Sequence, residues 1–255
     1  MGWIAVLVVV SVAIVLIAFR VLGKRGREDD EHGSSSVDFS ANLALAVYLL
    51  VLAYAAVLCR DALSVSEADV QAEAESLTEM YWSVAPIPEA APVRAQIRQY
   101  TAQSVDLDWP LMARNEMSPL PGQTLMDMRA TVLRLRPVGE ESRNLQQDTL
   151  DRISEVSHAR IVRSDDASTG LENTFVILLT LSGLLVIALP WAPGVRPTTT
   201  SIVADLVRVG VVLIGVCFIM LISHPFSGLG AVEPDAFKAA QRQYDQIDGQ
   251  FPAQP

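Results

Sequence analysis

The chain has 255 residues, of which 51% are hydrophobic, and its formal net charge at pH 7 is −10. With a mean hydropathy of +0.32, this balance indicates that apolar residues are concentrated in segments of their own and acidic residues lie outside them. The negative charge argues against nucleic-acid binding, which requires a basic surface.

Four apolar segments, two towards each end of the chain, are long enough to cross a bilayer. They comprise residues 3–19, 39–59, 174–191 and 202–223. Each is close to the ~20 residues that span a hydrocarbon core as a helix. The sequence therefore predicts an all-α, four-span integral membrane bundle, with two spans in residues 1–59 and two in residues 174–223.

The orientation of the spans is predicted from the basic residues after the first one, Arg20, Lys24, Arg25 and Arg27. No basic residue precedes that span and its apolar core exceeds the ~7–15 residues of a signal peptide, so it is interpreted as a retained helix. The positive-inside rule places the basic cluster in the cytoplasm. The N-terminus, the middle region and the tail are then extracytoplasmic, and the connections between paired spans, which include a flexible stretch at 33–36, are cytoplasmic.

Residues 60–173, between spans two and three, are predicted to form a helical insert. Ser64 and Ser66 have the spacing of capping residues at a helix start, and Pro86 ends that helix. Apolar residues at helical spacing predict three further helices, centred on residues 93–100, 125–135 and 145–156. Their apolar stripes are narrow, so these helices bury one face against each other or extend spans two and three as a stalk.

One face of the second span is a candidate pore or gate, and it consists of Asn42, Leu45, Tyr48, Leu49 and Leu52. A mainly hydrophobic face of this kind can gate by dewetting or simply pack against other helices. The hydroxyl of a mid-span tyrosine needs a partner within the bundle. Small residues on spans three and four, Gly183, Gly210 and Gly215 among them, predict close helix packing.

The fourth span begins with two ionisable residues, Asp205 and Arg208. They are three residues apart and therefore share a helix face, where they can pair. Charged groups at this depth usually face the bundle interior or a water-filled cavity. The alternative is that both side chains reach out to the nearby membrane interface.

A turn is predicted directly after the fourth span, at His224, Pro225, Phe226 and Gly228. The proline stops the helix, the phenylalanine offers an apolar anchor, and the glycine supplies backbone freedom. His224 is interpreted as an interfacial cap, with a pH-sensitive gate residue or a metal ligand as alternatives. The remaining residues, up to 255, form the tail.

The sequence contains no catalytic, metal or cofactor motif. His32 and His158 have no ligand-like spacing, and neither a nucleophile motif nor a phosphate-binding loop is present. Cys59 and Cys217 lie in or at the edge of spans, where they are expected to act as small apolar residues without a disulfide. No enzyme, no metal site and no cofactor is therefore predicted.

Several segments together carry a resemblance to a known family. They are the helix 67–81 (EADVQAEAESLTEMY), Tyr100 with 108–112 (DWPLM), 224–228 (HPFSG) and 233–237 (EPDAF). In their order around the four spans they resemble bacterial membrane proteins that have a "bestrophin-like" domain of unknown function.

The name of that domain points to the bestrophins, pentameric anion channels with four spans and a Pro-Phe-Gly element after the last. The element of this chain has an extra serine, Ser227. In some bestrophins an acidic cluster follows and binds calcium. Here only Glu233 and Asp235 follow closely, fewer than the ~6–8 oxygen ligands that calcium takes. The resemblance also implies a cytoplasmic insert, contrary to the orientation that the basic residues predict.

Two functions fit these observations. The first is a homo-oligomeric, bestrophin-like anion channel in the cell membrane, with a pore lined by one span of each subunit. The second is a non-conducting accessory or scaffold subunit that docks a protein partner through its insert and tail. In both, the lipid bilayer and other copies of the chain are the expected partners.

Overall fold

The computed structural model describes residue 10 and residues 31–189 and 199–252, and every regular element in these residues is a helix. The predicted first span and the basic cluster after it lie outside the described residues. The other three predicted spans overlap Phe39–Val84, Glu140–Ala188 and Ile202–Ile222, which contain helical stretches long and apolar enough to cross a membrane. The end of the third predicted span, at residues 190–191, lies outside the described residues.

The chain divides into two compact units. The first, here called the span unit, comprises Met1–Asp61 and Leu171–Ser223. The second, the insert unit, comprises Ala62–Gly170 and His224–Pro255. Each unit has its own cluster of buried apolar side chains.

Helix α2 runs without interruption from Glu31 to Val84. The flexible stretch predicted at 33–36 and the helix start predicted at Ser64 and Ser66 are therefore wrong. From residue 34 to residue 84 there is neither glycine nor proline, so nothing stops the helix once it has formed. The hydroxyl of Ser66, instead of capping a helix, donates to the Asp166 carboxylate at 2.9 Å. The predicted end before Pro86 is confirmed.

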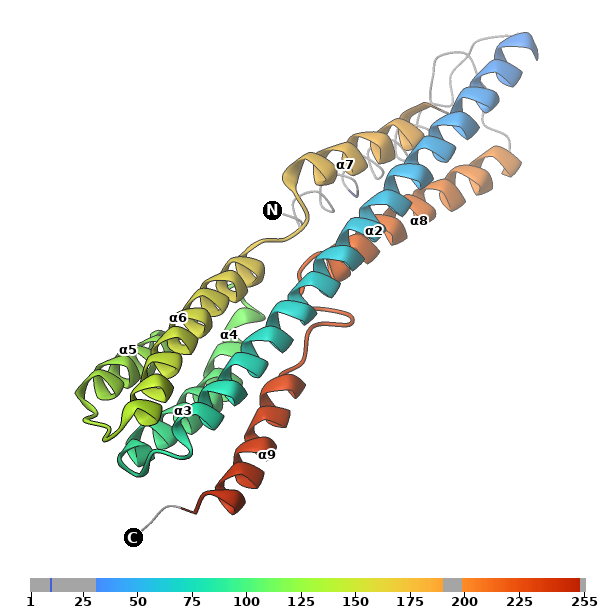
Figure 1. The fold of residues 1–255 in the computed structure, drawn as a ribbon. Coiled ribbons are helices and arrows are strands. Elements are labelled where there is room, and N and C mark those ends of the chain that lie inside the picture. The colour runs from blue at the N-terminus through green and yellow to red at the C-terminus, as the bar shows by residue number, and fades with distance from the viewer. Residues whose placement is uncertain (1–9, 11–30, 190–198, 253–255) are drawn as a thin grey trace. The chain divides into compact units, whose positions relative to one another are not determined.

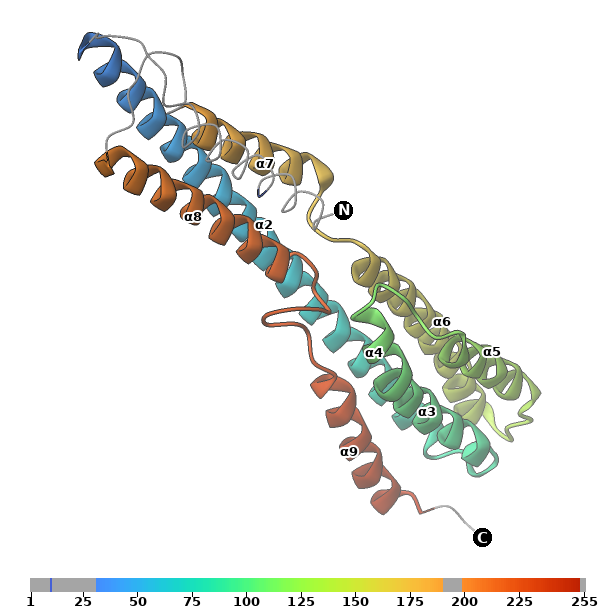
Figure 2. The ribbon, with the colours of Figure 1, turned by 180° about the vertical axis from the view of Figure 1, so that it is seen from behind.

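The described helices of the span unit are the N-terminal part of α2, α7 (Asn173–Ala188) and α8 (Thr199–Ile222). Both ribbon views show α7 and α8 running alongside this part of α2 (Figures 1 and 2). The core between them consists of small and aliphatic side chains around a single tyrosine, Tyr48.

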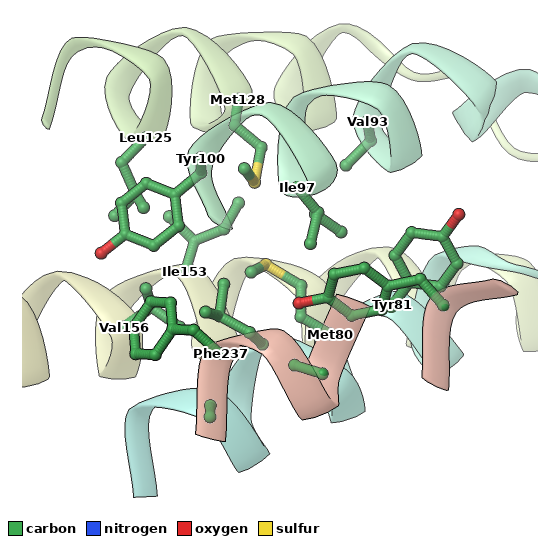
Figure 3. Close-up of a cluster of buried hydrophobic side chains, with 14 of the residues drawn as sticks. Met80, Tyr81, Val93, Ile97, Tyr100, Leu125, Met128, Ile153, Val156 and Phe237 are labelled. Atoms are coloured by element: carbon green, nitrogen blue, oxygen red, sulfur yellow. The ribbon is translucent and has the colours of Figure 1, made fainter. Parts of the chain in front are cut away.

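The insert unit combines the C-terminal part of α2 with shorter helices. They are η1 (Pro88–Ala90), α3 (Ala91–Gln103), the π-helical turn η2 (Ser104–Asp108), α4 (Trp109–Met112), α5 (Pro119–Arg134), α6 (Glu140–Ser168) and α9 (Asp235–Gln250). The three helices predicted after Pro86 correspond to α3, α5 and α6. Figure 3 shows their apolar side chains meeting those of α2 and α9 in one core, around Ile97, Met128 and Phe237.

Candidate functional site

Tyr48 holds the three described helices of the span unit together. Its side chain is fully buried, and its hydroxyl donates to the backbone carbonyl of Val212 on α8 at 2.9 Å. The ring fits against two glycines, because a Cβ on Gly215 would collide with the Tyr48 hydroxyl and one on Gly183 would lie 3.4 Å from its ring. The predicted close packing at these two glycines is confirmed, whereas a Cβ on Gly210 would meet nothing within 4 Å.

The five residues of the candidate pore face divide between two sides of α2. Leu45 and Leu52 are partly buried against the same core as Tyr48. Asn42 and Leu49 are exposed, and at 3.6 residues per turn they lie only about 20° apart around the helix. Together with the exposed Ala46 and Ala53 they form a surface here called the outer stripe, which consists of Asn42, Ala46, Leu49 and Ala53.

Asp205 and Arg208 pair on α8, with 3.2 Å between the Asp205 Oδ1 and Arg208 Nη1 atoms. Asp205 is buried, with 8% of its surface exposed. The second guanidinium nitrogen of Arg208 donates to Oδ1 of Asn42 at 3.4 Å. The structure therefore connects two groups of residues that the sequence suggested separately, the charge pair and the candidate pore face, through Asn42.

The segment after α8 folds into a tight turn of the insert unit. Val232 N–H donates to the Pro225 carbonyl at 2.8 Å, and Ser227 N–H donates to the His224 carbonyl at 3.3 Å. Gly228 has a φ of 86°, in the left-handed region that favours glycine. Phe226 is buried, and its ring lies edge-on to Trp109 with 6.3 Å between the centroids.

His224 packs against the segment that follows α6. A Cβ on Gly170 would lie 2.8 Å from His224 Nε2, so glycine at that position allows the imidazole to approach the backbone closely. Burial lowers the pKa of His224, which favours the neutral imidazole at pH 7. Among the described residues, no three histidine, cysteine or acidic side chains lie close enough to hold a metal ion.

The insert unit contains a buried ion network that the sequence patterns above do not predict. Arg163 of α6 is 1% exposed and binds the Glu73 carboxylate of α2 with two nitrogens, at 2.7 and 3.1 Å. The hydroxyl of Tyr100 donates to the same carboxylate at 2.5 Å. Burial raises the pKa of Tyr100, and the Glu73 charge raises it further, so this hydroxyl keeps its proton.

The same network includes Asp108, which is fully buried at the end of η2. Arg160 forms an ion pair with its carboxylate, and the Nη1 atom of Arg163 lies 3.5 Å from it. The backbone N–H of Ser118 donates to Asp108 as well, at 3.1 Å. Two carboxylates thus face two guanidinium groups, which leaves the buried cluster electrically neutral.

Trp109 links this network to the turn after α8. Its ring lies against the Arg163 guanidinium, with 5.1 Å from the guanidinium carbon to the ring centroid, and against Phe237 of α9. Its indole N–H donates to the Val232 carbonyl at 3.0 Å. The segments that carry the family resemblance, with Glu73, Trp109, Phe226 and Phe237 among their residues, therefore meet in one place.

A second polar cluster attaches α9 to the rest of the insert unit. Arg98 of α3 lies against the stacked rings of Tyr81 and Tyr244 and forms an ion pair with Asp248 at 2.8 Å. Desolvation alone would raise the pKa of Asp248, but hydrogen bonds from Tyr81 and Arg98 outweigh it and hold the pKa below its ordinary value. The carboxylate is therefore charged at neutral pH and holds α9 in place.

The fold and these contacts define a helical membrane protein in which a buried polar centre attaches the turn after the last span to a helical insert. Residues 5–237 match the family model of the Bestrophin-like domain, and the chain belongs to this family. Among curated proteins, none matches the sequence.

Solved structures share the fold at low sequence identity. One is a membrane protein variant with a TM-score of 0.55 and 12% identity, where the match covers 99% of this chain and 100% of that chain. Another is a bacterial Bestrophin homologue from Klebsiella pneumoniae, with a TM-score of 0.52, 12% identity and the same coverage of the two chains. A point variant of that homologue also has a TM-score of 0.52 and 12% identity, with 97% and 98% covered.

Proposed function

We propose that this protein is a homo-oligomeric anion channel of the bacterial cell membrane, with α2 of each copy lining the pore. Family membership and the bestrophin-like fold support the proposal. The observation that carries it is the outer stripe of α2, whose four residues are all exposed. In an oligomer, one such stripe from each copy can face a common axis.

The composition of the outer stripe suits a hydrophobic constriction. Leu49 is 44% exposed and lies between Ala46 and Ala53 on the same face of the helix. One bulky apolar side chain between small ones forms a narrow ring when it is repeated around an axis, and such a ring can gate by dewetting. Of the five residues predicted for the pore, we therefore propose Asn42 and Leu49 as pore-facing, and Tyr48, Leu45 and Leu52 as packing residues.

Shortening Leu49 is expected to increase flux. Leu49→Ala widens the proposed constriction, so halide efflux from liposomes that hold the purified protein should exceed that of the wild type. Leu50→Ala is the matched control, because Leu50 is the same residue type on the same helix and is 70% exposed on a neighbouring face. It should leave the rate of efflux unchanged.

The outcome that would contradict the proposal is efflux no faster than from empty liposomes, for the wild type and both variants, while all three elute as intact oligomers from a sizing column. That result would favour the accessory or scaffold subunit, which assembles in the membrane but does not conduct.

For the orientation we propose the arrangement that the basic residues predict, with the insert extracytoplasmic. In a variant without Cys59 and Cys217, a cysteine introduced at Asn144, which is exposed on α6, should react with an impermeant maleimide in intact cells, and one at Ser35 should not. Asn144 is preferable to the nearby Gln146, whose side chain donates to the carbonyls of Val132 and Leu135. The reverse labelling pattern would place the insert in the cytoplasm, as the resemblance to bestrophins implies.

A further inference from the structure

We infer that Arg208, held between Asp205 and Asn42, is the residue that makes the pore discriminate between anions and cations. The inference rests on the proposed function, because it needs a pore along the outer stripe. It assigns the discrimination between anions and cations to the charge pair within the spans. The hydrophobic constriction at Leu49 does not perform this task.

The first step is the position of the guanidinium group. Arg208 donates through Nη2 to the side chain of Asn42, the residue at one end of the outer stripe. This contact spans from α8 to α2 and brings a positive charge from the neighbouring helix to the border of the proposed pore surface. A planar guanidinium group can donate to Asn42 and Asp205 and still present N–H groups elsewhere.

The second step is the asymmetry of the pair. The Asp205 side chain has 9% of its surface exposed and the Arg208 side chain 16%, and of the two only Arg208 has a hydrogen bond to the outer stripe. An ion that moves along the stripe would therefore approach the guanidinium more closely than the carboxylate. Rings of arginine side chains favour anions, and rings of carboxylates favour cations.

The third step is the size of the effect. Coulomb interactions near a membrane interior are weakly screened compared with those in water. In an oligomer, each copy contributes one pair to a ring of charges around the pore. A substitution that changes the charge of each chain by one unit therefore changes the total charge of the ring by one unit for each copy. Removing either partner should thus shift the selectivity, in opposite directions for the two partners.

The test measures the chloride-to-sodium permeability ratio from reversal potentials across planar bilayers under a salt gradient. Arg208→Gln removes the positive charge of the pair and should lower the ratio severalfold. Asp205→Asn leaves an uncompensated guanidinium and should raise it. The double variant Asp205→Asn with Arg208→Gln removes both charges and should have a ratio between those of the single variants.

A variant at the exposed Asn42 keeps the test valid if the single variants of the buried pair fail to assemble. Asn42→Asp places a carboxylate beside Arg208 and should lower the ratio severalfold, and Asn42→Gln, which changes length but not charge, should leave it unaltered. If Asn42→Asp conducts with the wild-type ratio, Arg208 does not set the selectivity and the inference is overturned, while the channel itself stands. A wild type without conductance would overturn the proposed function and this inference with it.

Discussion

Replacing Arg163 with methionine is expected to destabilise the insert unit by about 3–5 kcal/mol, the usual cost of removing one partner from a buried ion pair. Glu73 is fully buried and receives two hydrogen bonds from this arginine. Without these two hydrogen bonds, the charge of Glu73 would remain in the core, where the Tyr100 hydroxyl still donates to it. The melting temperature of the purified protein in detergent should fall markedly, with loss of the proposed oligomer on a sizing column.

A matched control for Arg163→Met exists on the same helix. Arg152 pairs with Glu155 at the surface of α6, at 3.0 Å, and exposed pairs of this kind contribute only about 0–1 kcal/mol. Arg152→Met should therefore melt close to the wild type. The double variant Glu73→Gln with Arg163→Met should be milder than Arg163→Met alone, because it leaves no unpaired charge at Glu73. Equal melting of Arg163→Met and Arg152→Met would show that the buried network does not stabilise the fold.

The ends of helices could be predicted from the sequence where proline fixes the backbone. Pro86 lies two residues after the end of α2 at Val84, and Pro137 lies three residues after the end of α5 at Arg134. The start predicted at Ser66 failed for a related reason. A capping pattern is only a local preference, and with no helix-breaking residue nearby, the helix that arrives from the span continues through it.

The faces of α2 could not be predicted, because almost every residue of an apolar span is hydrophobic and periodicity then carries no signal. Leu45 and Leu49 are the same residue type, yet the first packs on the core and the second is exposed. Tyr48 did indicate which face of α2 is buried, because its hydroxyl needs a hydrogen-bond partner in an apolar surrounding.

The pairing of Asp205 with Arg208 could be predicted from the sequence because it is local, with one residue three positions from the other. The contact of Arg208 with Asn42 was not, because it joins residues 166 positions apart. The sequence contains one pattern from which the buried ion network can be predicted. Arg160 and Arg163 continue the apolar stripe of Ile153 and Val156 along α6, and charged residues in line with a buried stripe indicate a paired site in the core.

A substitution in the turn after α8 is expected to have the second large effect on stability, because Phe226 packs beside Trp109 and the buried ion network. Its ring contacts Trp109, and Trp109 in turn lies against Arg163 and Phe237. Only 5% of the Phe226 surface is exposed. A smaller side chain would leave a cavity that the indole ring cannot fill without giving up its hydrogen bond to the Val232 carbonyl.

Phe226→Ala is therefore expected to destabilise the protein by about 3–5 kcal/mol, the usual cost of truncating a buried aromatic residue, and to lower the yield of the proposed oligomer. Leu229→Ala, in the same turn but at a side chain that is 63% exposed, should change the stability by no more than about 0.5 kcal/mol. Thermal melting in detergent and elution from a sizing column measure both effects. If the two variants melt together, the turn is not anchored by Phe226, and the contact with Trp109 contributes nothing to holding the turn on the insert unit.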